Sequence, residues 1–187
     1  MKRYIIFLLL LSFTTLFAST NVYIGIGLSR VKETLDPYLA YIPEQKSIDN
    51  SELAMKIGYG HRDGYAAELS LNYLQNHSKV YANGDAQKLG FNVSLLKAYD
   101  FGIYVNPFLK AGFGAGTLKS DVDTNNQSLT YGNFHLGGGF FIPLSSQMDI
   151  ELAYQYRFIS YEKIDLNNAA NPKSHLNAIY AGFNIRF

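Results

Sequence analysis

Seven charged residues recur on the glycine-rich face of the chain's alternating segments, and the chemistry open to them is that of buried ion pairs. They are Lys56, Glu68, Lys88, Lys110, Glu151, Arg157 and Arg186. An isolated charge is costly in a low-dielectric interior, so charges on an enclosed face must pair. If this face is enclosed, we expect the two glutamates to lie among the three lysines and Arg157 in one internal network.

Nucleophilic and metal chemistry have few candidates. The absence of cysteine rules out disulfides, thiolate catalysis and thiolate metal sites. A Ser–His–acid site would have to draw on His77-Ser78, or on Ser174-His175 with Glu162. Neighbouring strand residues point to opposite faces, so the second pair is not expected to converge. The stretch 121–126 lacks the glycine and closing glutamate of a calcium loop. We expect no catalytic site, no bound metal and no cofactor.

Eight segments alternate between apolar and polar residues, which is the period of a β-strand with two different faces. They span 22–29, 52–60, 65–73, 88–95, 103–116, 131–142, 148–158 and 178–187. In the first, Val22 and Ile24 share one face, whereas Tyr23 and Gly25 share the other. A bulge at the glycine run 137–139 would shift the facing of the residues that follow it.

The connections between these segments alternate in length. Three have the size of hairpin turns, at 61–64, around 97–101 and at 143–147. Four are longer and rich in Asn, Asp, Ser and Lys, at about 30–50, 75–86, 117–129 and 160–173. Short turns at one rim and long polar loops at the other match a membrane barrel whose termini lie on the short-turn side.

The charged face also carries many glycines, and this decides which face looks inward. Glycine on a water-facing strand surface weakens the strand without any benefit. Inside a narrow barrel it makes room for Tyr23, Tyr131, Tyr180 and the long charged side chains. We therefore predict an all-β protein, an eight-stranded antiparallel up-and-down transmembrane β-barrel, with its apolar face toward lipid and a packed polar plug in its lumen. The charge network is expected to hold the barrel in one register rather than to conduct ions.

The N-terminus has the pattern of a secretory signal peptide. Lys2 and Arg3 precede an apolar stretch at 4–17, and the small residue Ala18 follows. The apolar stretch is shorter than the ~20 residues that a membrane-spanning helix needs. We expect residues 1–18 to be a cleaved signal peptide and residues 19–187 to form one barrel domain. The formal net charge of +1 creates no field that would attract nucleic acid, so no nucleic-acid partner is expected.

Two motifs carry a resemblance to a known family. The chain ends in alternating apolar residues, Tyr180-Ala181-Gly182-Phe183-Asn184-Ile185-Arg186-Phe187, and residues 106–114 form a glycine-rich strand that contains proline, an aromatic residue and an aliphatic one. Both resemble the small eight-stranded outer-membrane barrels of Gram-negative bacteria, the OmpA-transmembrane-domain and opacity-protein type. The resemblance implies location in the outer membrane and contact with its lipids and lipopolysaccharide. It also implies that Phe183, Ile185 and Phe187 form the signal read by the outer-membrane assembly machinery.

Neither motif specifies an activity, so several functions stay open. The favoured one is a scaffold whose four long loops serve envelope integrity, adhesion or surface recognition, with an extracellular ligand that the sequence does not identify. A narrow OmpW-like channel for small compounds is the main alternative. A lipid A-modifying enzyme and a soluble periplasmic carrier with an apolar cavity are the others.

Overall fold

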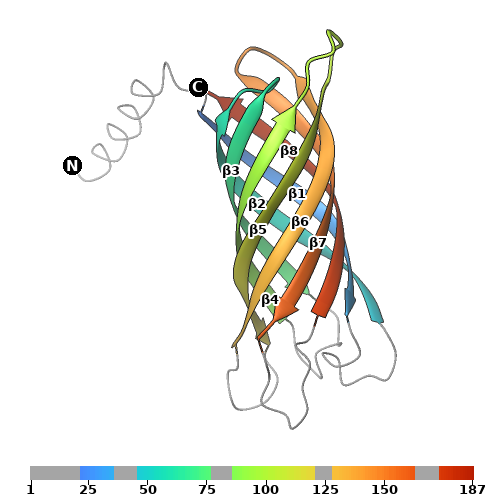
Figure 1. Ribbon diagram of the computed structural model, residues 1–187. Coiled ribbons are helices and arrows are strands. Elements are labelled where there is room, and N and C mark those ends of the chain that lie inside the picture. The colour runs from blue at the N-terminus through green and yellow to red at the C-terminus, as the bar shows by residue number, and fades with distance from the viewer. Residues whose placement is uncertain (1–21, 36–45, 77–85, 121–127, 163–172) are drawn as a thin grey trace, which may run out of the picture.

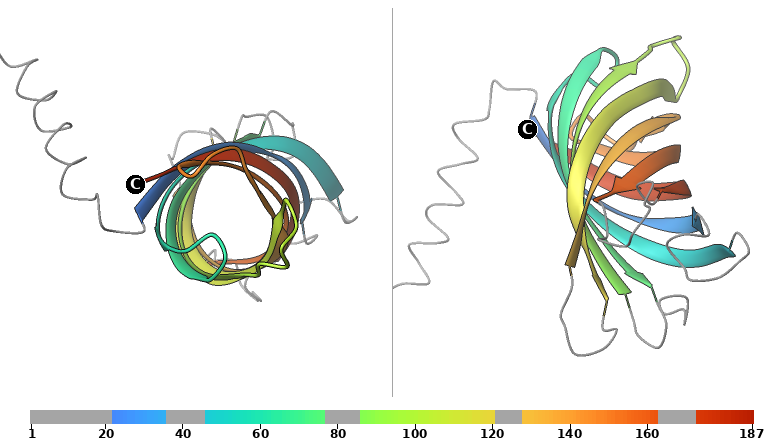
Figure 2. Two further views of the ribbon diagram at one scale, coloured as in Figure 1. Left: turned by 90° about the horizontal axis from the view of Figure 1, so that it is seen from above. Right: turned by 60° about the horizontal axis from the view of Figure 1, so that its bottom comes forward.

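The structure, a computed structural model, describes most of the chain after residue 21. The described residues are 22–35, 46–76, 86–120, 128–162 and 173–187. They form eight antiparallel strands, and β1 pairs with β8 to close the ring (Figures 1 and 2). The strands are β1 (Val22–Leu35), β2 (Lys46–Gly60), β3 (Tyr65–Asn76), β4 (Ala86–Ala98), β5 (Asn106–Ser120), β6 (Ser128–Pro143), β7 (Met148–Tyr161) and β8 (Lys173–Arg186). The predicted eight-stranded up-and-down barrel is therefore confirmed.

The expected signal peptide, residues 1–18, lies outside the described residues. Within the described ranges, no helix has the length and apolar character needed to cross a membrane.

The three short turns and the C-terminus lie at one end of the barrel, which we call the turn end (Figure 1). We call the opposite end, where the strands lead into the long connections, the loop end. The strands at the loop end are longer than the sequence indicated. β1 continues to Leu35 and β2 begins at Lys46, so both ends of the expected connection at 30–50 are strand. At the turn end, β5 begins at Asn106 rather than at Ile103, which lies in the turn.

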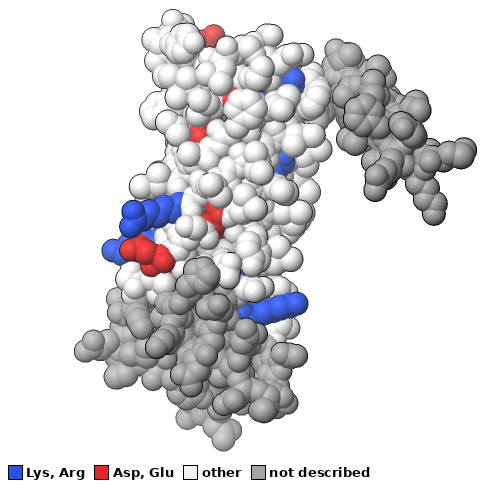
Figure 3. Space-filling model, turned by 180° about the vertical axis from the view of Figure 1, so that it is seen from behind, with Lys and Arg blue, Asp and Glu red and all other residues white. Residues whose placement is uncertain are grey.

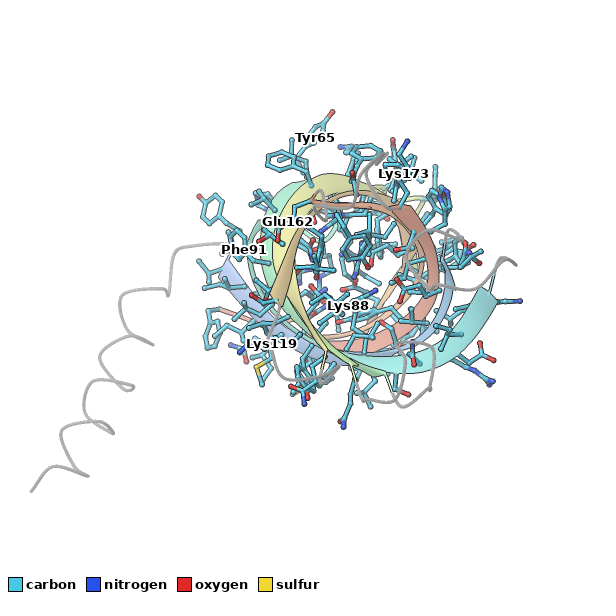
Figure 4. All side chains as sticks on the ribbon, turned by 90° about the horizontal axis from the view of Figure 1, so that it is seen from below. Tyr65, Lys88, Phe91, Lys119, Glu162 and Lys173 are labelled. Carbon is cyan, nitrogen blue, oxygen red and sulfur yellow. The ribbon has the colours of Figure 1, made fainter. Side chains whose placement is uncertain are left out.

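Side chains alternate strictly between the lumen and the outer surface of the barrel. Figure 4 shows the contrast, with Lys88 inside the ring of strands and Phe91 outside it. Outward apolar side chains form a continuous band, with 41% to 71% of their surface exposed in the isolated chain. They include Ile24, Ile26, Leu28, Met55, Ile57, Leu69, Leu71, Leu89, Phe91, Leu95, Leu109, Phe113, Phe134, Leu136, Phe140, Leu152, Ile179 and Ile185. So much exposed apolar surface is stable against acyl chains and not against water.

The glycine run of β6 contains no bulge, so the possible shift of facing is not found. Gly137, Gly138 and Gly139 pair in unbroken register with Lys110, Leu109 and Phe108 of β5. A Cβ added at Gly139 would lie 2.1 Å from the carbonyl oxygen of Leu152 on β7. Gly139 therefore lets the backbone of β7 approach β6 closely, at a position that has no room for a side chain.

The polarity of the two faces inverts beyond the apolar band at the loop end, although side chains still alternate between the lumen and the outer surface. The outer surface becomes polar there, at Arg30, Asp49, Gln75, Gln87, Lys119, Thr130 and Asn177. The inward side chains become apolar and are buried together, with Val31, Ile48, Leu74, Leu118, Ile159 and Leu176 in one cluster. A second apolar cluster fills the turn end and contains Tyr23, Ala66, Leu96, Phe108 and Phe141. The charges in the middle of the lumen lie between these two clusters, whereas Lys88 lies against Tyr161 of the loop-end cluster and Arg186 against Tyr23 and Phe141 of the turn-end cluster.

Glycines in the wall make room for tyrosine rings in the lumen, as the sequence predicted. A Cβ added at Gly58 would lie 2.2 Å from Cζ of Tyr23, and one added at Gly27 would lie 2.5 Å from Cζ of Tyr180. Both distances are well inside van der Waals contact. The rings can therefore lie against the wall only because these positions have no side chain.

Candidate functional site: the charged interior of the barrel

Four charged side chains meet in the middle of the lumen, and we call them the charge cluster. The Nζ of Lys110 on β5 lies 2.6 Å from the Oε2 of Glu68 on β3 and 3.5 Å from the Oε1 of Glu151 on β7. Lys56 of β2 lies 3.3 Å from Glu68 and also pairs directly with Glu151. The two cations and two anions thus alternate around a closed cycle. This cycle joins four strands across the interior of the barrel.

Neutral groups complete the surroundings of the charge cluster. The hydroxyl of Tyr23 donates to Glu68 at 2.7 Å, and the amide of Asn184 donates to Glu151 at 3.1 Å. The Lys56 ammonium also lies 5.4 Å from the ring centre of Tyr180. Charges taken out of water are tolerated only when they are paired and hydrogen-bonded, and the cluster meets both conditions.

Two of the predicted network members pair elsewhere, so the expectation of one network is wrong. Arg157 on β7 donates to both carboxylate oxygens of Glu52 on β2, at 2.8 and 3.1 Å. Lys88 on β4 pairs with Glu33 on β1 near the loop end. Both pairs lie nearer the loop end than the charge cluster, because their residues stand closer to the loop ends of their strands.

The remaining predicted cation, Arg186, pairs with Asp149 at the turn end. Asp149 also forms an ion pair with Arg62, whose Nη1 lies 3.0 Å from the Oδ1 of Asp149. Arg62 lies in the turn between β2 and β3 and donates further to the carbonyl oxygens of Ser145 and Ser146 in the β6–β7 turn. These contacts tie two turns to the strand ends.

The described interior contains as many acids as bases. Five cations face inward, namely Lys56, Lys88, Lys110, Arg157 and Arg186, and five carboxylates pair with them, namely Glu33, Glu52, Glu68, Asp149 and Glu151. The sequence-based network contained only two of these acids. Glu33 was missed because it lay in an expected loop. Glu52 stood on the charged face of its segment, and that position was the signal that could have found it.

A chain of amides continues from the Arg157–Glu52 pair across the lumen. Asn72 donates to Glu52 at 2.8 Å, Asn92 donates to Asn72 at 2.7 Å, and Asn133 donates to Asn92 at 2.9 Å. These residues come from β3, β4 and β6. The chain therefore adds a polar layer that links neighbouring walls of the barrel.

Ser94, His135 and Asn133 lie together in the order of a nucleophile, a base and an orienting group. The Oγ of Ser94 is 2.9 Å from Nε2 of His135, and the Oδ1 of Asn133 is 3.4 Å from its Nδ1. The adjoining internal cavity measures about 40 Å³. Ligand pockets typically measure about 300–1,000 Å³. The cavity holds roughly three water molecules, so these three residues have no room for a substrate.

The enzyme candidates named from the sequence do not come together in the described residues. Ser174 points inward and shares a hydrogen bond with Tyr161, whereas His175 stacks on Tyr156 outside the barrel, as strand alternation predicts. Glu162 accepts a hydrogen bond from the backbone of Thr130. His77-Ser78 and residues 121–126 lie outside the described part of the chain. Within that part, no group of three His, Cys, Asp or Glu side chains is arranged to hold a metal.

The predicted assembly residues lie at the end of β8 beside the start of β1. Ile185 and Phe187 are exposed, and Phe183 is half-buried. The backbone N–H of Phe187 donates to the carbonyl oxygen of Val22 at 2.9 Å. The C-terminal residue therefore extends the β1–β8 pairing by one further hydrogen bond.

An apolar outer band, a charge-paired interior and short turns at a single end define a transmembrane β-barrel of the outer-membrane type. Residues 5–187 match the family described as outer membrane protein beta-barrel domain. The chain belongs to this family, and the protein is an outer-membrane protein. A comparison with the sequences of curated proteins found no match.

Solved structures with the same fold support this assignment. Neisserial surface protein A is 16% identical, with a TM-score of 0.70, over 89% of this chain and 97% of that one. Ail, the attachment invasion locus protein of Yersinia pestis, is 17% identical, with a TM-score of 0.56, over 88% of this chain and 98% of that one. OprG of Pseudomonas aeruginosa is 15% identical, with a TM-score of 0.55, over 90% of this chain and 96% of that one. At these identities the likeness establishes the fold alone.

Proposed function

We propose that the protein is a closed outer-membrane scaffold, which passes no solute through its lumen and presents its four long connections for surface recognition or adhesion. The observation that carries closure is the charge cluster, which spans the lumen through Lys56, Glu68, Lys110 and Glu151. An ion that crossed this layer would have to break pairs that the low dielectric of the interior makes strong.

Two further observations support a closed lumen. A cluster of buried apolar side chains lies on each side of the charge cluster, so an ion would also have to displace apolar side chains that offer it no polar partner. The internal cavity beside the charge cluster measures about 40 Å³. Eight-stranded barrels are narrow enough for side chains to fill them, which agrees with this arrangement.

The strand extensions at the loop end support the presentation of the long connections. β1 and β2 pair from Leu35↔Lys46 down the whole of their length, beyond the outward polar residues Arg30 and Asp49. The pair Lys88–Glu33 and the hydroxyl of Tyr161 hold the interior of this extension together. The long connections thus begin on paired strands outside the apolar band. In Ail, which shares this fold, the name itself assigns attachment and invasion.

Replacing the four long connections with short turns tests this function. Because the described ion pairs of the interior are made among strand and turn residues, we expect the shortened protein to reach the outer membrane and to migrate as a folded barrel on unheated gels. Binding of bacteria that produce it to host-cell or extracellular-matrix surfaces should fall to the level of bacteria without the protein. Equal binding by the full and shortened proteins would contradict a recognition role.

Lipopolysaccharide is the partner that we propose for the outer surface at the loop end. Figure 3 shows large basic side chains protruding from the visible wall next to this end, with an acidic side chain beside them, and smaller charged areas nearer the turn end. Exposed basic residues there include Arg30, Lys32, Lys119 and Lys173. Their charges suit the phosphates of lipopolysaccharide, whose acyl chains would cover the adjoining apolar band. Replacing all four with glutamine should reduce the lipopolysaccharide that co-purifies with the folded barrel, and unchanged recovery would contradict this contact.

A further inference from the structure

Lys97 is an outward-facing cation at the turn end of the apolar band. On β4 it follows Leu95 on the same face, and Leu95 is 71% exposed. Its ammonium lies 4.2 Å from the ring centre of Tyr65 on β3 and 5.6 Å from that of Tyr99. Figure 4 shows Tyr65 pointing away from the barrel. Two rings therefore hold the ammonium in one place at the edge of the band.

No carboxylate of the described residues forms an ion pair with Lys97, in contrast to the five inward cations. The aromatic rings stabilise its charge on their own sides only. The ammonium has three N–H donors, and its open side can bind an anion.

An apolar hollow of about 780 Å³ adjoins Lys97 on the outer surface. Its base is formed by the small residues Ala67 and Ala111, which lie in register on either side of Leu95. Tyr59 borders Ala67 on β2, and Leu136 borders Ala111 on β6. The wall thus has two shallow depressions separated by the ridge of Leu95, with Lys97 at the end of that ridge.

We propose that this surface binds one diacyl glycerophospholipid, with its phosphate on Lys97 and its two acyl chains in the depressions at Ala67 and Ala111. The charge of Lys97 complements a phosphate, and the paired depressions match two chains joined at one headgroup. The turn-end leaflet of the membrane supplies such a lipid at high local concentration.

The turn between β4 and β5 supports a headgroup-level position for Lys97. Tyr99 and Phe101 stack with their ring centres 6.1 Å apart. Phe101, Ile103 and Tyr104 are 67%, 58% and 76% exposed, although they lie in a connection. Aromatic and aliphatic side chains of this kind are stable at the boundary between headgroups and acyl chains.

Native mass spectrometry of the detergent-purified protein with added dioleoylphosphatidylglycerol tests the proposal. We expect a one-lipid complex, and we expect Lys97→Gln to lower its fraction by about tenfold, since it removes a charge-assisted contact. Ala111→Leu should lower it as well, because the new side chain fills one depression. Asp49→Asn, which changes an outward charged residue at the loop end, should leave the complex unchanged. Each variant must first show the gel migration of a folded barrel.

Two lipid analogues separate the headgroup from the chains. Dioleoylglycerol, which has both chains and no phosphate, should bind weakly and should be insensitive to Lys97→Gln. Lysophosphatidylglycerol, which has one chain, should be sensitive to Lys97→Gln and bind less than the diacyl lipid. Equal lipid retention by the wild type, Lys97→Gln and Ala111→Leu would overturn the proposal. So would a dimer that disappears with Ala111→Leu, because a second copy of the chain would then occupy the surface.

Discussion

Arg157 on β7 and Glu52 on β2 form a two-point ion pair across the lumen, although 105 residues separate them in the sequence. The two strands are not neighbours in the barrel, so this pair connects parts of the wall that are separated by β8 and β1. Both side chains are almost completely buried. The pair therefore fixes the distance between strands that share no backbone hydrogen bonds.

Removing one partner of this pair should be strongly destabilising. Glu52→Ala leaves the Arg157 guanidinium buried without its carboxylate, and we expect a loss of about 3–5 kcal/mol in the free energy of unfolding. Urea titration of the barrel in lipid vesicles, followed by gel migration, measures the change. The double variant Glu52→Leu with Arg157→Met should be more stable than Glu52→Ala alone, because no unpaired charge remains. A loss below the error of the titration would show that the pair is not a structural contact.

The close packing of Tyr23 against Gly58 predicts a second stability effect. Gly58→Ala should cost about 1–3 kcal/mol, because the new methyl group overlaps the tyrosine ring. Gly132 on β6 provides the matched control, since a Cβ there would lie 4.0 Å from its nearest neighbour, the carbonyl oxygen of Gly114. Gly132→Ala should be neutral or slightly stabilising. Equal effects of the two substitutions would mean that the tyrosine does not occupy the space beside Gly58.

Because the chain lacks cysteine, single cysteines can report which positions are enclosed. Ser94→Cys places a thiol in the lumen, where its exposure is 4%, and Asp63→Cys places one in an exposed turn. A membrane-impermeant thiol reagent should label Asp63→Cys rapidly in the folded barrel and Ser94→Cys only after unfolding in urea. Rapid labelling of both thiols in folded protein would show that water and solutes enter the interior.

Phe187 is expected to matter for assembly more than for stability. Its side chain is 40% exposed, and its backbone makes the last hydrogen bond to β1. We therefore expect Phe187→Ala to reduce the amount of protein that reaches the outer membrane in cells, through a weaker signal to the assembly machinery. Refolding of the purified variant into detergent should match that of the wild type. A similar defect in both experiments would assign Phe187 a purely structural role.

The fold could be predicted from the sequence because each transmembrane strand contacts two different solvents. Ile24 and Ile26 face lipid, and Gly25 and Gly27 face the lumen, so period-two alternation marks both the strand and its orientation. The same logic explains where prediction failed. Beyond Arg30 the outer surface of the barrel is polar, and the apolar side chains face the lumen. In the sequence, this exchange was interpreted as the end of the strand.

The pairing within the lumen was less accessible to sequence reasoning. Alternation places a residue on a face, but partners depend on the register and tilt of strands that are distant in the sequence. Thus Lys88 and Arg157 were assigned to the correct face and to the wrong acids. Glu33, which pairs with Lys88, was hidden in the part of β1 that had been taken as loop. The Ser94–His135 contact likewise joins β4 to β6, which are not paired with each other because β5 lies between them.

Single-channel recording of the wild-type barrel in a planar lipid bilayer tests the closed lumen most directly. With the charge cluster in place and apolar layers on both sides of it, we predict a flat current trace from fully folded, inserted protein in concentrated potassium chloride. Discrete conductance steps that scale with the amount of inserted wild-type barrel would contradict a sealed scaffold and indicate a channel.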